Sequence, residues 1–247
     1  MAKKIDYYDY WSSKKKENHP VIKSREKKAL NLIIPLMHDN ISILDIGCGD
    51  GSFMQELKKV KENSNIFGIE YSDREIEEAR KKGLDVRKMD VEQGIDFQGN
   101  GFEIVYAGEV IEHIFNPDNF LAEINRILKR GGHLLITTPN LCAWFNRILF
   151  PFGVQPIFLE PSTKSKLVGS GFLGKLKKDN HPVGHIRVFT FQALKDLLEM
   201  NGFKIEKVKG ASYEEGFPKK LIFIDRMMTW ISPKLAGHFV ILAKKVK

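Results

Sequence analysis

The chain of 247 residues is 43% hydrophobic and 28% charged, which suits one globular domain with a sizeable core. Its formal net charge of +8 would draw nucleic acid or an anionic membrane, although a solvated lysine-rich surface explains it more simply. Two cysteines build no disulfide framework, no secretory signal follows the first lysines, and residues 141–159 are too interrupted by polar residues and prolines to cross a bilayer. We expect a reduced, cytoplasmic protein with, at most, peripheral membrane contact.

Seven apolar runs alternate with helical patterns, which is typical of a mainly parallel sheet with helices on both faces. Pro117 suits the first position of a helix, which Gly131 should end. Thr190 is expected to cap one further helix, and the pair Ser72 and Glu75 another. The predicted strands span residues 41–47, 65–71, 84–90, 102–108, 132–139, 203–210 and 239–246.

Two long excursions interrupt this alternation, at residues 141–189 after the fifth strand and at residues 211–238 between the last two strands. Long loops in a compact domain are usually lids or binding elements. In doubly wound sheets, ligands bind beyond the carboxyl ends of the strands, where the first excursion begins. We therefore expect residues 1–247 to form a single domain whose first excursion is a lid.

The stretch ILDIGCGDG, residues 43–51, predicts a strand that ends in a ligand-binding glycine loop. Its glycines follow the spacing GxGxG rather than the GxGxxG of dinucleotide folds, and the lysine of a phosphate loop is missing. Asp45 would repel a phosphate but suits a ligand with an ammonium group. The loop therefore indicates a nucleoside with a positively charged tail.

Two further carboxylates follow successive predicted strands. Glu70 ends the second strand, where an acidic side chain accepts hydrogen bonds from ribose hydroxyls. Asp90 ends the third strand, where it can accept a hydrogen bond from an exocyclic amine of adenine. Together with Asp45, these positions in register with the strands indicate an adenine nucleoside site.

These motifs resemble those of class I S-adenosylmethionine-dependent methyltransferases, from about residue 21 to 246 of the chain. ILDIGCGDG resembles the first motif of that family, GIEYSD and KMDVE resemble its second- and third-strand motifs, and residues 108–140 resemble the block from the fourth to the fifth strand. The resemblance implies an α/β fold with a doubly wound, Rossmann-like sheet of seven strands, mostly parallel with the last antiparallel. It also implies S-adenosylmethionine as cofactor, covered by an N-terminal cap and helix in residues 1–40.

The same resemblance implies cofactor contacts residue by residue. The glycine loop would cradle the methionine part, Glu70 would bind the ribose, and Asp90 would lie at the adenine. Arg25 matches a position that grips the cofactor carboxylate in some relatives, and the YYDYW segment resembles one that caps the cofactor. The implied cofactor-binding residues are Tyr8, Trp11, Arg25, Asp45, Gly47, Cys48, Gly49, Gly51, Glu70, Tyr71, Asp90, Val91, Gly108 and Glu109.

The sequence GEVIEH after the fourth strand offers metal or acid–base chemistry. Glu109, Glu112 and His113 stand at i, i+3 and i+4, so on a helical turn they share one face. His185, at the end of the first excursion, could fold back over the same strand ends. Two carboxylates and two imidazoles can bind a divalent cation that lowers the pKa of an acceptor hydroxyl. Small-RNA 2′-O-methyltransferases are similar in this pattern and use Mg²⁺, and some ubiquinone-pathway O-methyltransferases also resemble it.

The same residues leave two other interpretations open. His113 or His185 can act as a catalytic base without a metal, and either can have a purely structural role. The remaining histidines, among them His238, form no comparable pattern and are interpreted as incidental.

The excursions bear on the methyl acceptor. Residues 141–159 are aromatic and apolar, which favours a lipophilic or aromatic acceptor or a lid on a membrane surface, whereas residues 164–181 are basic and could order over an anionic group. We expect O-methylation of a small or lipid-linked acceptor. The alternatives are an RNA 2′-O- or tRNA-modifying enzyme, disfavoured because no RNA-binding module is evident, and a non-catalytic cofactor-binding subunit that docks through residues 221–231. The oligomeric state stays open.

Overall fold

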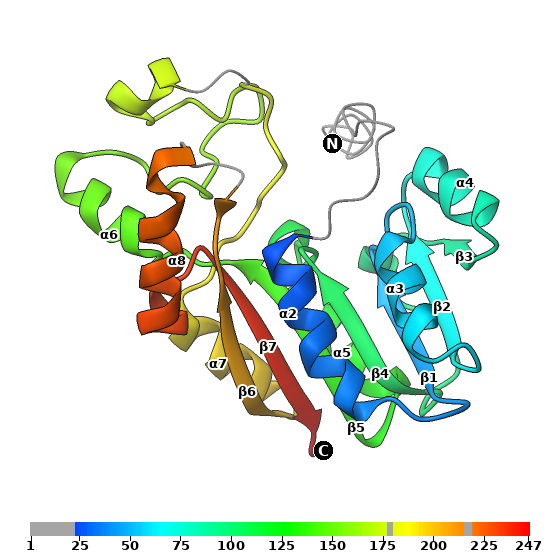
Figure 1. The fold of residues 1–247 in the computed structure, drawn as a ribbon. Coiled ribbons are helices and arrows are strands. Elements are labelled where there is room, and N and C mark those ends of the chain that lie inside the picture. Colours follow the sequence, from blue (N-terminus) through cyan, green and yellow to red (C-terminus); the bar gives the residue numbers. More distant parts are fainter. Residues whose placement is uncertain (1–22, 177–179, 215–218) are drawn as a thin grey trace.

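The computed structural model describes residues 23–176, 180–214 and 219–247, and a seven-stranded sheet of order β3-β2-β1-β4-β5-β7-β6 lies at its centre (Figure 1). Neighbouring strands from β3 to β5 are parallel, whereas β7 runs antiparallel to both β5 and β6. The predicted fold class and all seven strands are confirmed. The strands are β1 (Ser42–Ile46), β2 (Asn65–Glu70), β3 (Asp85–Lys88), β4 (Phe102–Gly108), β5 (Leu128–Pro139), β6 (Phe203–Ala211) and β7 (His238–Lys245).

Helices cover both faces of this sheet. The α-helices are α2 (Ser24–Ile33), α3 (Ser52–Val60), α4 (Asp73–Lys81), α5 (Pro117–Ile127), α6 (Trp144–Leu149), α7 (Phe191–Met200) and α8 (Ile222–Ile231). Short 3₁₀ turns are η1 (Ile34–Leu36), η2 (Val91–Gln93), η3 (Ile111–His113), η4 (Phe150–Phe152), η5 (Gly171–Leu176), η7 (Lys219–Leu221) and η8 (Pro233–Leu235).

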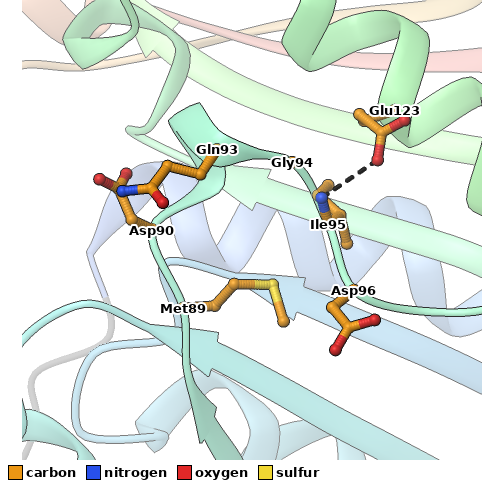
Figure 2. Close-up of a pocket in the computed structure, with 7 residues that line it drawn as sticks. All are labelled: Met89, Asp90, Gln93, Gly94, Ile95, Asp96 and Glu123. Atoms are coloured by element: carbon orange, nitrogen blue, oxygen red, sulfur yellow. Dashed lines mark hydrogen bonds between the residues drawn. The ribbon is translucent and has the colours of Figure 1, made fainter.

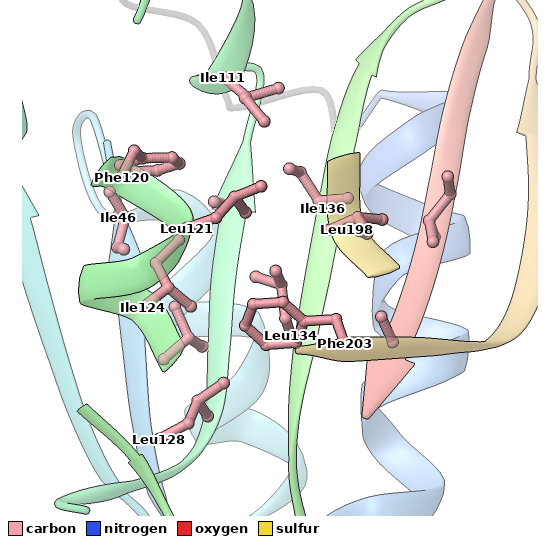
Figure 3. Close-up of a cluster of buried hydrophobic side chains, with 14 of the residues drawn as sticks. Ile46, Ile111, Phe120, Leu121, Ile124, Leu128, Leu134, Ile136, Leu198 and Phe203 are labelled. Carbon is pink, nitrogen blue, oxygen red and sulfur yellow. The ribbon is translucent and has the colours of Figure 1, made fainter. Parts of the chain in front are cut away.

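Two hydrophobic cores result from this layering. Helices α2, α3 and α4 pack on one face of the sheet, and α5 and α7 pack on the other face, where Figure 3 shows part of the larger cluster. Strand β1 contributes to both cores, because successive side chains of a strand point to opposite faces of the sheet. Ile43 belongs to the first core and Leu44 to the second. Because both faces of the sheet are covered, its central strands are apolar throughout rather than alternating.

Most of the local signals are confirmed, but one is wrong. Thr190 Oγ1 accepts a hydrogen bond from the amide of Ala193, and Pro117 begins α5. However, α5 ends at Ile127 rather than at Gly131, because the chain enters β5 at Leu128. Gly131, with a φ of +73°, instead lies where the register between β4 and β5 shifts. A glycine in an irregular strand and a glycine that stops a helix give the same sequence signal.

The two excursions pack against each other. Trp144 Nε1 in α6 donates to Asp225 Oδ1 in α8 at 2.8 Å, and the amide of Tyr213 donates to Asp225 Oδ2 at 2.6 Å. Figure 1 shows α6 and α8 side by side, beyond the carboxyl end of β5. A small core of Ala143, Phe145 and Phe158 lies in the same region. In the part of the chain that the structure describes, no helix is long and apolar enough to cross a membrane.

Candidate active site

The loop between β1 and α3 is built from glycines that no other residue replaces easily. Gly47, Gly49 and Gly51 have φ angles of +70°, +54° and +73°, a left-handed region that glycine adopts without strain. A Cβ atom at Gly47 would lie 2.7 Å from Val110 Cγ2, and one at Gly51 would clash with Leu84 Cδ1. The loop is therefore closely packed, and the amides of Gly47, Gly49 and Gly51 all have acceptors within the chain.

Glu70, at the end of β2, organises this loop. Its Oε2 accepts a hydrogen bond from the amide of Gly49 at 2.9 Å, and its Oε1 accepts from the amides of Tyr71 and Ser72 at 2.7 and 2.9 Å. The side chain is buried. The carboxylate thus joins the tip of the β1 loop to the end of β2. The contact of Glu70 with a ribose remains a prediction. The same carboxylate already accepts hydrogen bonds from three backbone amides.

Asp45 is the buried carboxylate that lacks such partners. It is 1% exposed, and its Oδ2 has no hydrogen-bond partner among the described residues. Burial, and after it the negative charge of Glu70, raises the pKa of Asp45 well above its usual range. A buried carboxylate in this condition is completed by a cation. The ammonium group of S-adenosylmethionine has that charge, so the residues present fit this cofactor.

Asp90 lies two residues beyond the end of β3, and its Oδ1 accepts a hydrogen bond from the amide of Glu92 at 3.1 Å. The loop that carries it borders a cavity of about 390 Å³, and Figure 2 shows Asp90 and Gln93 together at one side of it. A contact between Asp90 and adenine stays a prediction, and the cavity beside Asp90 is compatible with it. The lining residues are Met89, Asp90, Gln93, Gly94, Ile95, Asp96 and Glu123.

Three further predicted cofactor residues have clear packing roles. Cys48 is buried, its Sγ would lie 2.7 Å from a Cβ at Gly68, and burial raises the pKa of its thiol far above the usual range, so it acts as a small packing group. Val91 begins η2. Gly108 ends β4 directly against the hydroxyl of Tyr106, which leaves no room for a side chain. Tyr8 and Trp11 lie outside the described residues.

Glu109, directly after β4, is the centre of a buried polar network. Its Oε2 lies 3.4 Å from Arg25 Nε and 3.3 Å from His238 Nε2, and its Oε1 accepts from Thr137 Oγ1 at 2.9 Å. Burial alone would raise the pKa of Glu109, but Arg25 and His238 together hold it well below its usual range. The ionised carboxylate thus joins α2, β5 and β7.

His238 is a site residue that the sequence analysis missed. It is 3% exposed and belongs to the Glu109 network, so its interpretation as incidental is corrected. The feature that places His238 at this site is the topology of the sheet. Because β7 is antiparallel, its first residue lies beside Pro139 at the carboxyl end of β5, where ligands bind.

Glu112, His113 and His185 form a second cluster, in which one donor atom of each lies within 4.8 Å of the others. His113 Nδ1 lies 3.0 Å from the carbonyl oxygen of Gly184, and His185 Nδ1 lies 2.9 Å from that of Phe158. A carbonyl only accepts, so each Nδ1 carries a proton, and a ring in its neutral form has its lone pair on Nε2. Burial lowers the pKa of His185, which favours its neutral form.

Glu112 is fully buried and anchors this cluster. Its Oε2 accepts from Thr138 Oγ1 at 3.0 Å, whereas its Oε1 has no hydrogen-bond partner in the described parts of the chain. Its carbonyl oxygen accepts the amides of Ile186 and Arg187, which holds the segment of His185 against η3. Burial, and then the charge of Glu109, raises the pKa of Glu112 well above its usual range.

The four residues expected at a metal site are thus divided between two clusters. The turn η3 begins only at Ile111, and Glu109 before it has a φ of +58°, so the expected shared helical face does not form. The side chain of Glu109 faces Arg25 and His238 instead. Sequence reasoning also missed Glu160, whose carboxylate accepts the amides of residues 183–185 and so orders the segment of His185.

Comparison with known proteins gives the family of this chain. The family described as "Methyltransferase domain" matches residues 19–208. The human mitochondrial ubiquinone biosynthesis O-methyltransferase is 25% identical over 182 residues, 70% of this chain and 44% of the relative. The ubiquinone biosynthesis O-methyltransferase of Caulobacter vibrioides is 31% identical over 108 residues, 41% of this chain and 42% of the relative. The matches thus span less than half the length of these two relatives.

Solved structures share the fold at low identity. A chain in the Haloferax volcanii complex of a methyltransferase with its Trm112 activator has a TM-score of 0.66 at 16% identity, over 98% of this chain and 97% of that one. An S-adenosylmethionine-dependent methyltransferase of Archaeoglobus fulgidus has a TM-score of 0.59 at 21% identity, over 90% and 95%. By its family match, its sheet order and its glycine loop, the chain belongs to the methyltransferase-domain family and has the class I fold of S-adenosylmethionine-dependent methyltransferases.

Proposed function

We propose that the chain transfers the methyl group of S-adenosylmethionine to a hydroxyl of a small or lipid-linked acceptor. The observation that carries this proposal is the cluster of Glu112, His113 and His185, whose donor atoms lie within 4.8 Å of one another beyond β4. A hydroxyl acceptor needs a group that takes its proton, and this cluster offers one. The O-methyltransferase names of the human and Caulobacter relatives also favour oxygen as the methylated atom.

Bound S-adenosylmethionine supplies an electrophilic methyl group on its sulfonium, so the protein's task is to align the acceptor and to remove its proton. Asp45, whose Oδ2 has no hydrogen-bond partner among the described residues, would pair with the ammonium group of the cofactor beside the glycine loop. The methyl group would pass to the acceptor oxygen, with S-adenosylhomocysteine as the leaving group, and Nε2 of His185 would accept the proton of the acceptor hydroxyl. The neutral form that burial favours makes His185 competent for this step near neutral pH. His113 is the alternative base.

A divalent cation at the same cluster is the second arrangement that the donor set allows. Both imidazoles direct Nδ1 toward a backbone carbonyl, the outer contact that orients histidine ligands. With Glu109 held elsewhere, the set has two nitrogens and one carboxylate, which suits Zn²⁺, Mn²⁺ or Fe²⁺ better than Mg²⁺. Such a cation would lower the pKa of the acceptor hydroxyl directly.

The proposal is tested with methyl-labelled S-adenosylmethionine and fractionated extract of the source organism, with and without a chelator. Label in the organic or small-molecule pool supports an O-methyltransferase of a small or lipid-linked acceptor. Label in RNA, lost with chelator and restored by a divalent ion, would replace it with the RNA-modifying alternative. Restoration by Mn²⁺ or Zn²⁺ but not by Mg²⁺ would favour the mixed nitrogen–oxygen site.

Variants of the two histidines test their role. His113→Ala and His185→Ala should depress turnover while leaving the affinity for S-adenosylhomocysteine, measured by calorimetry, nearly unchanged. His38→Ala is the matched control, because the His38 side chain is 60% exposed and lies before β1, outside the cluster. Normal turnover in both site variants would contradict the base and the cation alike.

A further inference from the structure

Helix α8 is packed with its polar residues inward and its apolar residues outward. Asp225 and Thr229 are 0% and 7% exposed, whereas Phe223, Met227 and Trp230 are 65%, 48% and 86% exposed. These three apolar residues recur at i, i+4 and i+7, so they form one stripe along the helix. A helix on a water-soluble surface normally has the reverse arrangement.

Specific contacts fix α8 in this orientation. Both carboxylate oxygens of Asp225 accept hydrogen bonds, one from Trp144 Nε1 and one from the amide of Tyr213. Rotation of the helix to bury Trp230 would remove Asp225 from both donors. The outward apolar stripe is therefore a consequence of packing inside the lid.

The neighbouring α6–η4 segment adds to this surface. Ile148, Phe150 and Phe152 are 52%, 66% and 76% exposed. Hydrogen bonds from α6 to Asp225 and to the carbonyl oxygen of Lys234 link the segment to α8 and η8. Figure 1 shows α6 beside α8. We call the exposed apolar side chains of α6, η4 and α8 the lid patch. Large exposed apolar side chains gathered on neighbouring elements mark a contact with a protein or a membrane.

The charges around the lid patch distinguish among its occupants. Arg147, Lys220 and Lys234 are exposed beside it. Arg147 Nε donates to a backbone carbonyl and Lys234 Nζ lies over the ring of Phe191, so neither charge is used on a carboxylate in these contacts. The carboxylate of Asp225 is buried. The rim is therefore positive, within a chain whose net charge is +8.

A positive rim disfavours a second copy of the same patch, because a twofold contact would bring like charges together. An anionic lipid surface has the opposite charge and also accepts the apolar side chains. Aromatic residues with flanking Lys and Arg are the usual composition of interfacial membrane anchors.

We infer that the lid patch docks the protein on an anionic lipid bilayer. Its aromatic side chains would lie in the membrane interface, and the flanking Arg147, Lys220 and Lys234 would lie at the headgroups. The inference goes beyond the proposed methyl transfer and does not depend on the acceptor. Its physical consequence is that α6 and η4, which belong to the same excursion as His185, lie next to the lipid.

The test is flotation of the full chain with vesicles of phosphatidylcholine alone and of phosphatidylcholine mixed with an equal amount of phosphatidylglycerol. We expect binding to the mixed vesicles only, weakened by added salt. The double variant Phe223→Ser, Trp230→Ser should bind the mixed vesicles at least about tenfold more weakly than the wild type, because it removes the two most exposed aromatic side chains of α8. Met200→Ser is the matched control, since Met200 is an 80% exposed apolar residue of α7 outside the patch.

Light scattering and melting curves complete the test. The double variant should keep the melting temperature of the wild type, because both side chains are exposed. Absence of wild-type binding to the mixed vesicles, or equal binding by the double variant and the wild type, overturns the inference. Light scattering that shows a dimer for the wild type and a monomer for the double variant would overturn the inference and assign the lid patch to a second copy of the chain.

Discussion

The variant Asp45→Asn should be more stable than the wild-type chain and should bind the cofactor more weakly. Asp45 is almost fully buried, its Oδ2 has no hydrogen-bond partner in the described residues, and burial together with the charge of Glu70 raises its pKa well above the usual range. An acid whose pKa is raised on folding binds its proton more tightly in the folded state. Its unfavourable contribution therefore appears as pH rises from the unfolded value, about 3.9, through the raised folded value.

The magnitudes follow from what the substitution removes. A buried unsatisfied group costs about 1–3 kcal/mol, and more when it is charged. Asparagine removes the charge but leaves an amide in the same place, so we expect a net gain of about 1.5 kcal/mol in the free energy of unfolding. For a chain of this size, that raises Tm by about 3–6 °C. Loss of the charge opposite the cofactor ammonium should cost about 2 kcal/mol, or roughly 30-fold in Kd.

Thermal unfolding without ligand, at neutral and at acid pH, measures the first effect, and calorimetry with S-adenosylhomocysteine measures the second. The gain in Tm should be present at neutral pH and should shrink in acid, where the wild-type carboxyl is also protonated. A variant that melts lower than the wild type and binds with unchanged affinity would refute the reasoning, because Asp45 would then have a structural role.

Three other changes address the same strand ends. Gly51→Ala should lower the free energy of unfolding by about 2–4 kcal/mol in denaturant titrations, because it adds backbone strain and a clash with Leu84. Gly83→Ala is the control, because Gly83 has a similar φ but a Cβ there would have no atom of the described residues within 4 Å. An equal loss in both variants would contradict the clash. Glu70→Ala leaves three backbone amides without their acceptor and should cost about 3 kcal/mol, with weaker cofactor binding by calorimetry; unchanged stability would refute its role in the loop. His238→Leu should cost about 2 kcal/mol in the same titration because Glu109 Oε2 loses its hydrogen-bond partner Nε2. A neutral effect would show that Arg25 suffices.

The fold was predictable because its determinants are local and repeated. Strands buried on both faces are apolar throughout, and a glycine loop follows the first of them, so the sheet and the cofactor side of the site can be read along the chain. Asp45, Glu70 and Asp90 could be placed at one edge of the sheet for the same reason, since each lies at or near the carboxyl end of a parallel strand. Their contacts with the cofactor remain predictions.

The acceptor side was harder to predict because its geometry depends on distant contacts. Glu109 was placed with Glu112 on the assumption of a helical turn, but its left-handed backbone turns the side chain toward Arg25 and His238. His238 reaches the site only through the antiparallel pairing of β7 with β5, which no local pattern reveals.

Helix α8 shows the same limit in another form. Its sequence, IFIDRMMTWI, has apolar residues on every side, so periodicity does not indicate which face is buried. The orientation is decided by Asp225, whose hydrogen bonds come from residues that are 81 and 12 positions away. A buried carboxylate with two donors outweighs the tendency to bury Trp230, and the stripe that remains exposed is the surface available for docking.

The carboxylates at the carboxyl ends of the strands divide into two kinds, and we propose that those with an unsatisfied oxygen are completed by a ligand. Glu70 and Glu109 have both oxygens engaged by backbone amides or by side chains. Asp45 Oδ2 and Glu112 Oε1 have no hydrogen-bond partner among the described residues. Unsatisfied groups cost stability, so a folded chain retains them where a ligand completes them. Asp45 adjoins the cofactor loop and Glu112 adjoins the histidines. Stabilisation by S-adenosylhomocysteine should therefore depend on Asp45 and persist in Glu112→Gln, whereas any stabilisation by a divalent cation should show the opposite dependence.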